Sequence, residues 1–236
     1  MIDRSTNIKA ALRSRQRGFL LNPYRFGSSS PPLPGSVVYL NHFDGTDGST
    51  SLSDVTGKSY TLTGTGISLK TDQKKFGTAS LSGFSGGRSL YVSGITFGLT
   101  EDFTVVAWAR WGGSTSNHAI FTLVSAGIEI LVSGGEICLW TATDGWSRCD
   151  PMPMNEWVLV AFERKDLQNT LTLNGVVQTS LTGPYINSSG VMNIGCYNNS
   201  SGSESFDGHI DEMLVRVGGT QFGGGAFTPP TEPFSV

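Results

Sequence analysis

From residue 37 onward, the chain consists of short strand-like apolar runs separated by glycines, and no helical pattern interrupts them. Glycine is favoured in tight turns because it reaches positive φ angles at little steric cost. The chain contains 31 glycines without a collagen-like or low-complexity period, so we interpret many of them as turn residues. Many short strands with hairpin turns indicate an all-β, two-sheet antiparallel sandwich or jelly roll. A length of 236 residues, 38% of them hydrophobic, suffices for one such core.

Hydrophobic alternation locates the individual strands. In the run 103–111, the odd-numbered residues up to Ala109 share one apolar face, and Trp108 lies on the other face. Asn174 and Gly175 separate two strand-like runs and predict a type I′ hairpin turn, which needs two positive φ angles. The predicted strands are residues 37–43, 103–111, 119–124, 128–132, 136–141, 157–163, 170–173, 176–179, 191–194 and 209–217, with weaker signals at 60–63, 78–81 and 90–92.

The first 36 residues differ from the rest in charge and composition. They hold six basic residues and one acidic residue, whereas the remainder holds ten basic and eighteen acidic residues. Basic arms of this size bind nucleic acid or an acidic protein surface, or are merely solvated. Residues 18–27 are also apolar and aromatic, so their exposure to water is costly. A Ser/Pro-rich linker, 28–35, follows them.

We therefore divide the chain into an arm, residues 1–36, and a jelly-roll domain, residues 37–236. We expect the arm to anchor the protein in a larger assembly, with charge steering the approach and apolar side chains supplying the buried area. The predicted anchor residues are Arg13, Arg15, Arg17, Phe19, Leu20, Tyr24 and Phe26.

Cysteine usage and hydropathy indicate where the protein is made. Three cysteines, Cys138, Cys149 and Cys196, are too few and too irregularly spaced for a disulfide framework or a zinc site. Cys138 and Cys149 could pair across a hairpin, but buried thiols are the default interpretation. No apolar run approaches the ~20 residues of a membrane span, and the first four residues do not open a signal peptide. We expect assembly in a reducing cytoplasm and no membrane partner.

Seven segments, in order, resemble the motifs of one family. They are 40–50 (LNHFDGTDGST), 76–81 (FGTASL), 102–108 (DFTVVAW), 157–161 (WVLVA), 173–176 (LNGV), 206–212 (FDGHIDE) and 227–234 (FTPPTEPF). Together they resemble the concanavalin A-like, laminin-G-type jelly rolls of bacteriophage proteins. Val158 and Leu159 replace the usual pair of histidines, and Leu214 replaces the usual arginine. The resemblance implies a concanavalin A-like fold and a phage virion protein, and the arm's "LLNPYRF" is similar to leaders of such proteins.

The same resemblance raises the possibility of a glycan hydrolase. Hydrolases of this class carry two carboxylates on one strand in a Glu-x-Asp-x-x-Glu pattern. Here Asp211 and Glu212 are adjacent, so a regular strand would point them to opposite faces, and Glu129 and Glu136 lie in separate strands. The three histidines lie in unrelated contexts, and no phosphate-binding loop precedes a helix. We predict that the protein is not an enzyme and has no catalytic residues.

Asp211 has two interpretations. In a regular strand it would share an inward face with Met213, Val215 and Val217. It could bind calcium with Asp44 or Asp207, because relatives of the fold hold calcium at a sheet rim, or it could accept backbone N–H bonds that join edge strands. We favour the second interpretation and predict no metal and no cofactor.

Aromatic side chains on loops are natural stacking platforms for sugar rings. The segment Thr143 to Arg148 contains Trp146 among polar neighbours and is the best candidate for such a loop. The alternative for Trp146 is a residue that caps the sandwich rim or meets another subunit, and the sequence leaves the two open. The weaker glycan-binding candidates are Trp111, Tyr197 and Asn198.

These features support three functions. The first is a virion structural protein whose arm docks on the tail or baseplate while a lectin-like domain contacts host-surface glycan. The second is a capsid decoration protein that uses the same arm, and the third is a glycan hydrolase. We favour the first, because lectin-like folds suit adhesion. The expected partners are other virion proteins, host glycan and further copies of the chain in the particle, with nucleic acid not expected.

Overall fold

The computed structural model describes residues 33–123, 127–183, 188–197 and 204–236. The arm, apart from residues 33–36, lies outside the described residues, and so do all the predicted anchor residues. No helix long and apolar enough to span a membrane occurs in the described part of the chain. The strands are β1 (Ser36–Asn41), β2 (Tyr60–Leu62), β3 (Ser68–Lys70), β4 (Ser80–Ser82), β5 (Leu90–Phe97), β6 (Phe103–Trp111), β7 (His118–Leu123), β8 (Ile128–Ser133), β9 (Glu136–Thr141), β10 (Gly145–Pro151), β11 (Trp157–Lys165), β12 (Gln168–Leu173), β13 (Val176–Thr182), β14 (Ser188–Ile194) and β15 (Gly208–Val217).

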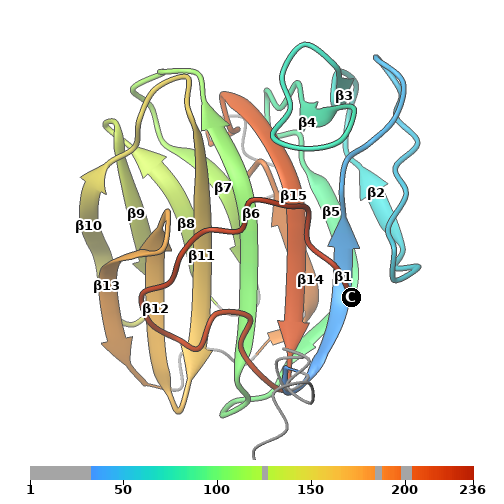
Figure 1. The fold of residues 1–236 in the computed structure, drawn as a ribbon. Coiled ribbons are helices and arrows are strands. Elements are labelled where there is room, and N and C mark those ends of the chain that lie inside the picture. Colours follow the sequence, from blue (N-terminus) through green and yellow to red (C-terminus); the bar gives the residue numbers. More distant parts are fainter. Residues whose placement is uncertain (1–32, 124–126, 184–187, 198–203) are drawn as a thin grey trace, which may run out of the picture. The chain divides into compact units, whose positions relative to one another are not determined.

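The strands form two antiparallel sheets that pack face to face (Figure 1). Sheet A has the order β13-β12-β11-β6-β15-β4-β3, and β1 also pairs with β15. Sheet B has the order β10-β9-β8-β7-β14-β5-β2 and lies behind sheet A in this view. Neighbours in the sheets are often distant in sequence, as in the pairing of β6 with β15. This arrangement confirms the predicted two-sheet antiparallel jelly roll.

The main hydrophobic core lies between the sheets. Phe103, Val105 and the alternate residues after them in β6 point into it, while Val106 and Trp108 point to the outer face of sheet A. The predicted alternation of this strand is therefore confirmed. The ring of Phe103 lies 5.7 Å from that of Phe162 on β11, in a tilted arrangement that aromatic pairs favour.

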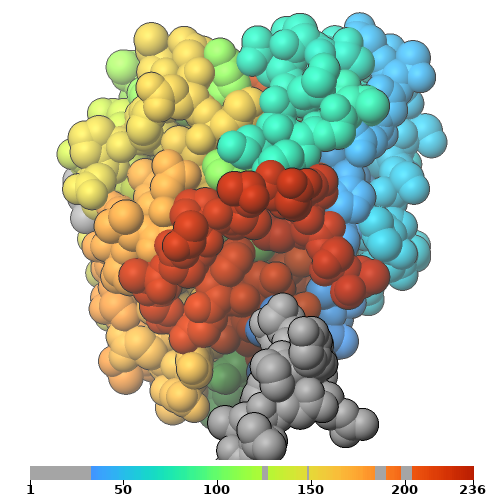
Figure 2. Space-filling view, viewed as in Figure 1, coloured from blue at the N-terminus to red at the C-terminus, as the bar shows by residue number. Residues whose placement is uncertain are grey.

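The C-terminal segment, residues 218–236, crosses the outer face of sheet A (Figures 1 and 2). Phe222 and Phe227 stack with ring centroids 3.8 Å apart and pack against Trp108 and its neighbours. Phe234 is also buried there. The segment therefore covers apolar side chains on the outer face of sheet A.

Most predicted strands are confirmed to within a few residues, but β3 and β10 were not predicted. Asn174 and Gly175 have φ angles of 48° and 76°, which confirms the type I′ hairpin. The segment around Trp146 was wrongly predicted to be a loop, since Trp146 lies within β10. Its polar composition concealed a strand at the edge of the sheet, where one side of the strand faces solvent.

Candidate functional site

A straight row of side chains crosses the outer face of sheet B from one edge to the other. Each member is the direct cross-strand partner of the next, so the row runs perpendicular to the strands. From edge to edge, the row is Thr61 (β2), Tyr91 (β5), Asn193 (β14), Thr122 (β7), Glu129 (β8), Trp140 (β9) and Trp146 (β10). Most of the residues directly before and after these seven in the sequence belong to the inter-sheet core or pack on it. Because successive side chains of a strand point to opposite faces, the seven side chains of the row point outward.

Two tryptophans stand side by side at the β10 end of this row. Trp146 pairs with Trp140 across the β9–β10 hairpin, and 49% of Trp146 is exposed to solvent. Trp140 is half-buried and packs against Leu131 and Cys138. An exposed indole beside a supported one is an open aromatic surface on an otherwise regular strand pair.

Glu129 adjoins Trp140 in the next strand and is only 5% exposed. Its Oε1 atom is buried and has no hydrogen-bond partner among the described residues. Burial raises the pKa of Glu129 to about 8, and the nearby charge of Glu204 raises it further in the same direction. At neutral pH this carboxyl group is therefore mostly protonated, and it can donate as well as accept a hydrogen bond.

Tyr197 lies over the middle of the row, next to Thr122 and Asn193. Its carbonyl oxygen accepts hydrogen bonds from Thr122 Oγ1 at 2.9 Å and from Asn193 Nδ2 at 3.2 Å. Its side chain packs against Ala119 and the neighbouring apolar residues of the outer face. The structure thus places Tyr197 on the same face as Trp146, and its backbone covers the middle of the row.

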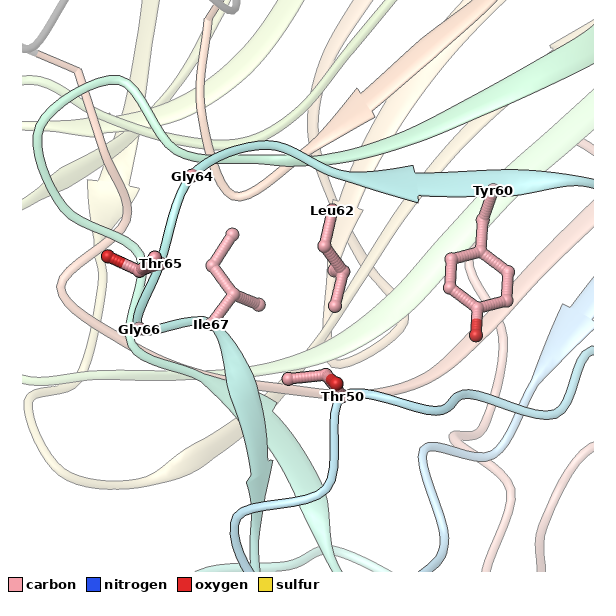
Figure 3. A pocket seen from close by; sticks show the side chains of 7 residues that line it. All are labelled: Thr50, Tyr60, Leu62, Gly64, Thr65, Gly66 and Ile67. Carbon is pink, nitrogen blue, oxygen red and sulfur yellow. The ribbon is translucent and has the colours of Figure 1, made fainter.

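A separate pocket of about 440 Å³ lies at the other edge of sheet B, beside β2 (Figure 3). Tyr60, Leu62 and Ile67 contribute apolar surface, and Thr50 lies near them. The hydroxyl group of Tyr60 accepts a hydrogen bond from the backbone N–H of Leu52 at 2.8 Å. None of the described lining residues is charged, so the pocket offers little to orient a polar ligand.

Comparison with known proteins identifies the domain. Residues 82–216 match the family described as the concanavalin A-like lectin/glucanases superfamily. The chain belongs to this superfamily. The match covers more than half of the chain and agrees with the two-sheet architecture. No curated protein matched the chain.

Solved structures share the superfamily fold at low sequence identity. Domain 4 of AbnA, a GH43 extracellular arabinanase from Geobacillus stearothermophilus in complex with arabinotriose, has a TM-score of 0.60 and 20% identity, covering 79% of this chain and 94% of that one. Trypanosoma rangeli sialidase in complex with sialic acid has a TM-score of 0.58 and 8% identity, covering 76% and 30%. The botulinum neurotoxin DC binding domain in complex with rat synaptotagmin II has a TM-score of 0.55 and 12% identity, covering 77% and 48%. This chain thus spans less than half of the sialidase and neurotoxin chains.

Within this concanavalin A-like domain, the other predicted glycan-binding residues lie elsewhere. Trp111 ends β6 and is only 7% exposed, in the inter-sheet core against Gly135. The prediction that Trp111 is a surface platform was wrong, because the odd-numbered face of β6 points inward as far as its last residue. Asn198 lies outside the described residues. The structure therefore places Trp146 and Tyr197 on the same face of sheet B, over different strands, and places Trp111 in the core.

Asp211 does not share the inward face of Met213. A β-bulge between Asp211 and Leu214, with Glu212 at a φ of 51°, breaks the alternation. Asp211 is paired with Trp108, whose side chain lies on the outer face of sheet A, so the predicted inward orientation was wrong.

The Asp211 carboxylate accepts backbone N–H bonds. Its Oδ2 accepts from Lys75 at 2.7 Å and from Phe76 at 3.2 Å, and its Oδ1 accepts from Glu212 at 2.9 Å. These bonds confirm the interpretation that Asp211 joins neighbouring segments of the sheet. Burial still raises the pKa of Asp211 to about 7.

The alternative calcium partners of Asp211 also have polar contacts of their own. Asp44 accepts hydrogen bonds from the backbone N–H and the hydroxyl of Thr78, and Asp207 accepts one from the N–H of Ser114. The described residues contain no group of three or more His, Cys, Asp or Glu side chains placed to hold a metal ion.

The cysteine pair is also resolved by strand geometry. Cys138 is directly opposite Arg148 in the β9–β10 ladder and belongs to the outer-face cluster. Cys149 packs against the inter-sheet core instead. The two thiols point to opposite faces of sheet B, which rules out a disulfide across this hairpin.

The sequence interpretation missed Trp140 and the environment of Glu129. The sequence places Glu129 and Trp140 in two separate predicted strands, 128–132 and 136–141, and indicates no contact between them. The alternation of residues 128–132 and 136–141 gives the face of each residue, but not their cross-strand register. The register that pairs β8 with β9 is what makes Glu129 and Trp140 neighbours.

Proposed function

We propose that this chain is a non-enzymatic structural protein of a bacteriophage particle, in which the arm docks on the tail or baseplate and the concanavalin A-like domain contacts host-surface glycan. The phage assignment is supported by the seven motif segments, and the anchoring role by the charge and aromatic content of residues 1–36. Proteins incorporated through a basic, apolar arm gain orientation from charge and affinity from buried apolar area.

The observation that carries the glycan-binding part is the exposed Trp146 beside Trp140 on the outer face of sheet B. The exposed indole of Trp146, beside the partly buried Trp140, offers an apolar surface on which a sugar ring can stack. The domain with a TM-score of 0.60 was solved with a bound arabinotriose, which supports carbohydrate as the class of ligand.

The proposal that the protein is not an enzyme rests on the use of its adjacent carboxylates. Asp211 is occupied by three backbone N–H groups. Glu212 accepts the backbone N–H of Phe234 at 2.9 Å, and its other oxygen lies 2.8 Å from His42 Nδ1. Both carboxylates therefore hold the fold together, which leaves neither positioned as a general acid beside a glycosidic bond.

Two measurements on the full-length protein test the proposal. Binding to polysaccharide extracted from the host envelope is expected, without release of reducing sugar. Quantitative gel analysis of purified particles is expected to show a few to a few dozen copies, as in a tail or baseplate. Hundreds of copies would favour capsid decoration, and sugar release that Glu129→Gln abolishes without unfolding would show a hydrolase instead.

A further inference from the structure

The edge strands of the two sheets differ in how well they are protected. An edge strand exposes backbone N–H and C=O groups that can pair with another chain. β2 and β3 are only three residues long, and β3 ends at Lys70. A loop covers β1, since the Leu40 N–H donates a hydrogen bond to Asp54 Oδ1 at 2.9 Å. β10 contains Asp150 and ends at Pro151. Short length, a covering loop, charge and proline all disfavour pairing with another chain.

β13, the edge strand of sheet A beside β12, has none of these four protections (Figure 1). It is seven residues long, and its sequence, VVQTSLT, contains no charge and no proline. Val176 and Val177 expose 59% and 42% of their surface. A bulge interrupts the pairing with β12 at Gln178, but the pairing is regular from Thr179 to Thr182. No described strand lies on the outer side of β13, so this edge is open to another chain.

Side-chain hydrogen bonds hold β13 in an extended conformation. Gln168 on β12 donates to Ser180 Oγ at 2.5 Å and accepts from Thr182 Oγ1 at 2.9 Å. The backbone N–H of Asp150 on β10 donates to Gln178 Oε1 at 3.1 Å, which ties β13 to the edge of sheet B. An edge that is already ordered loses little conformational entropy when a second strand pairs with it.

We propose that β13 pairs antiparallel with the β13 strand of a second copy of this chain, which joins the two A sheets into one continuous sheet. A second copy is the favoured occupant because a two-fold axis relates two identical antiparallel strands, so residues near the axis face their own counterparts. Like charges placed opposite each other would repel, and β13 carries none. This inference goes beyond the proposed function, because it assigns a contact between copies.

The alternation of side chains limits the register of this pairing. Residues that are directly opposite each other lie on the same face of a sheet, so the two-fold axis passes through a residue position. In the regular stretch, an axis at Ser180 pairs this exposed residue with its own counterpart and pairs Thr179 with Leu181. Leu181 packs against the inter-sheet core, so the pair with Thr179 extends the inward face across the interface.

The competing occupant is the arm of a second copy. Residues 1–36 are basic and the remainder of the chain is acidic, so an arm could bind a neighbouring domain by charge. A contact driven by charge weakens as salt is added, whereas pairing of an uncharged strand does not. The area buried by two short strands falls below that of a stable dimer interface. We therefore expect a weak dimer that forms at high protein concentration.

Sedimentation velocity of the full-length protein between about 5 and 500 µM measures the association. The dimer fraction is expected to rise with concentration, and the dissociation constant to change less than about twofold between ~0.1 and ~0.5 M salt. Hydrogen exchange measured by mass spectrometry locates the contact. Amides of residues 176–182 should exchange at least about threefold more slowly at the high concentration, while those of β10 exchange equally at both.

Charge substitutions at the expected axis test the pairing itself. Ser180→Lys and Ser180→Glu are each expected to weaken dimerisation at least about tenfold, because two like charges then face each other. An equimolar mixture of the two variants should dimerise again, because the facing charges are then opposite. Ser59→Lys, at an exposed serine next to β2, is the matched control and should dimerise like the unchanged protein. Circular dichroism checks that each variant is folded, and misfolded variants could not restore dimerisation on mixing.

The outcomes separate this contact from its alternatives. A protein that stays monomeric at every concentration would overturn the proposal, and so would a dimer that both Ser180 variants retain. If that retained dimer also weakens steeply with salt, the contact belongs to the arm. None of these results bears on glycan binding or on incorporation into particles, so the proposed function stands or falls by its own measurements.

Discussion

Glu129 illustrates how strand geometry gives one residue unusual chemistry. Its neighbours Ile128 and Ile130 belong to the inter-sheet core, so the carboxyl group points to the outer face. Cross-strand packing then buries it beside Trp140, where desolvation disfavours the charged form. The same side chain on an exposed strand would be an ordinary surface carboxylate.

This burial predicts a pH dependence of stability. The pKa of Glu129 rises from 4.5 in the unfolded chain to about 8 in the folded protein. The folded state therefore binds more protons than the unfolded state between these values, and the free energy of unfolding falls as the pH rises through this interval. Asp211, whose pKa is raised to about 7, acts in the same direction.

Glu129→Gln is expected to weaken the dependence of stability on pH. At pH ~8.5 it should raise the free energy of unfolding by about 1 to 3 kcal/mol relative to the unchanged protein, because the glutamine side chain carries no charge that must be buried. At pH ~4.5 the two proteins should differ little, since both side chains are neutral in the folded state. Urea unfolding at several pH values measures the difference. If the free energy of unfolding changes equally with pH in both proteins, the pKa of Glu129 is not raised in the folded state.

At the scale of elements, the C-terminal segment acts as a cover for sheet A. The Glu163 carboxylate on β11 accepts the backbone N–H bonds of Phe222 and Gly224 and the hydroxyl of Thr104. Gly175, in the β12–β13 hairpin, lies so close to the Phe227 carbonyl that no Cβ fits between them. Polar and steric contacts therefore fix the segment over the apolar face of the sheet.

Glu163→Ala is expected to destabilise the domain by about 2 to 4 kcal/mol, because it leaves buried backbone donors unpaired. It should also expose residues 218–236 to limited proteolysis. Chemical denaturation and mass spectrometry of the digest measure the two effects. Glu232→Ala, at an exposed position in the same segment, is the control. A Glu163 variant as stable and as resistant to protease as the control would show that this carboxylate does not hold the segment.

At the scale of the whole molecule, the described residues of the range 33–236 form both sheets and the hydrophobic core between them. Residues 1–32 lie outside this description, and their role stays a prediction. Arg216 links the start of the domain to β15, since its Nη1 lies 3.4 Å from the carbonyl oxygens of Pro34 and Gly35. A truncation should therefore keep the chain from Leu33 onward.

A chain comprising residues 33–236 is expected to be soluble, to unfold in one cooperative transition and to bind the same glycan as the full-length protein. It should fail to enter phage particles, because the predicted anchor residues are removed. Scanning calorimetry checks folding, titration with the glycan checks binding, and gel analysis of particles made with the truncated chain checks incorporation. Aggregation would mean that the arm completes the fold, and normal incorporation would exclude the arm as the anchor.

Much of the fold was predictable from local patterns. The alternation in residues 103–111 and the turn at Asn174 and Gly175 depend on nearby sequence only, and both are confirmed. The strand that contains Trp146 was missed, because its polar composition resembles a loop. The orientation of Asp211 was also wrong, because a bulge depends on how β15 meets β6 rather than on the sequence of β15 alone.

The sequence by itself determined the fold class, the family and the face on which most strand residues lie, because side-chain alternation and turn chemistry are local properties. Only the tertiary structure decided that Glu129, Trp140 and Trp146 stand in one row and that Trp111 does not join them. Cross-strand register depends on pairings between segments distant in the chain and on bulges that shift them. Burial of a carboxyl group beside an indole, and hence its protonation, follows from that register and from the packing around it.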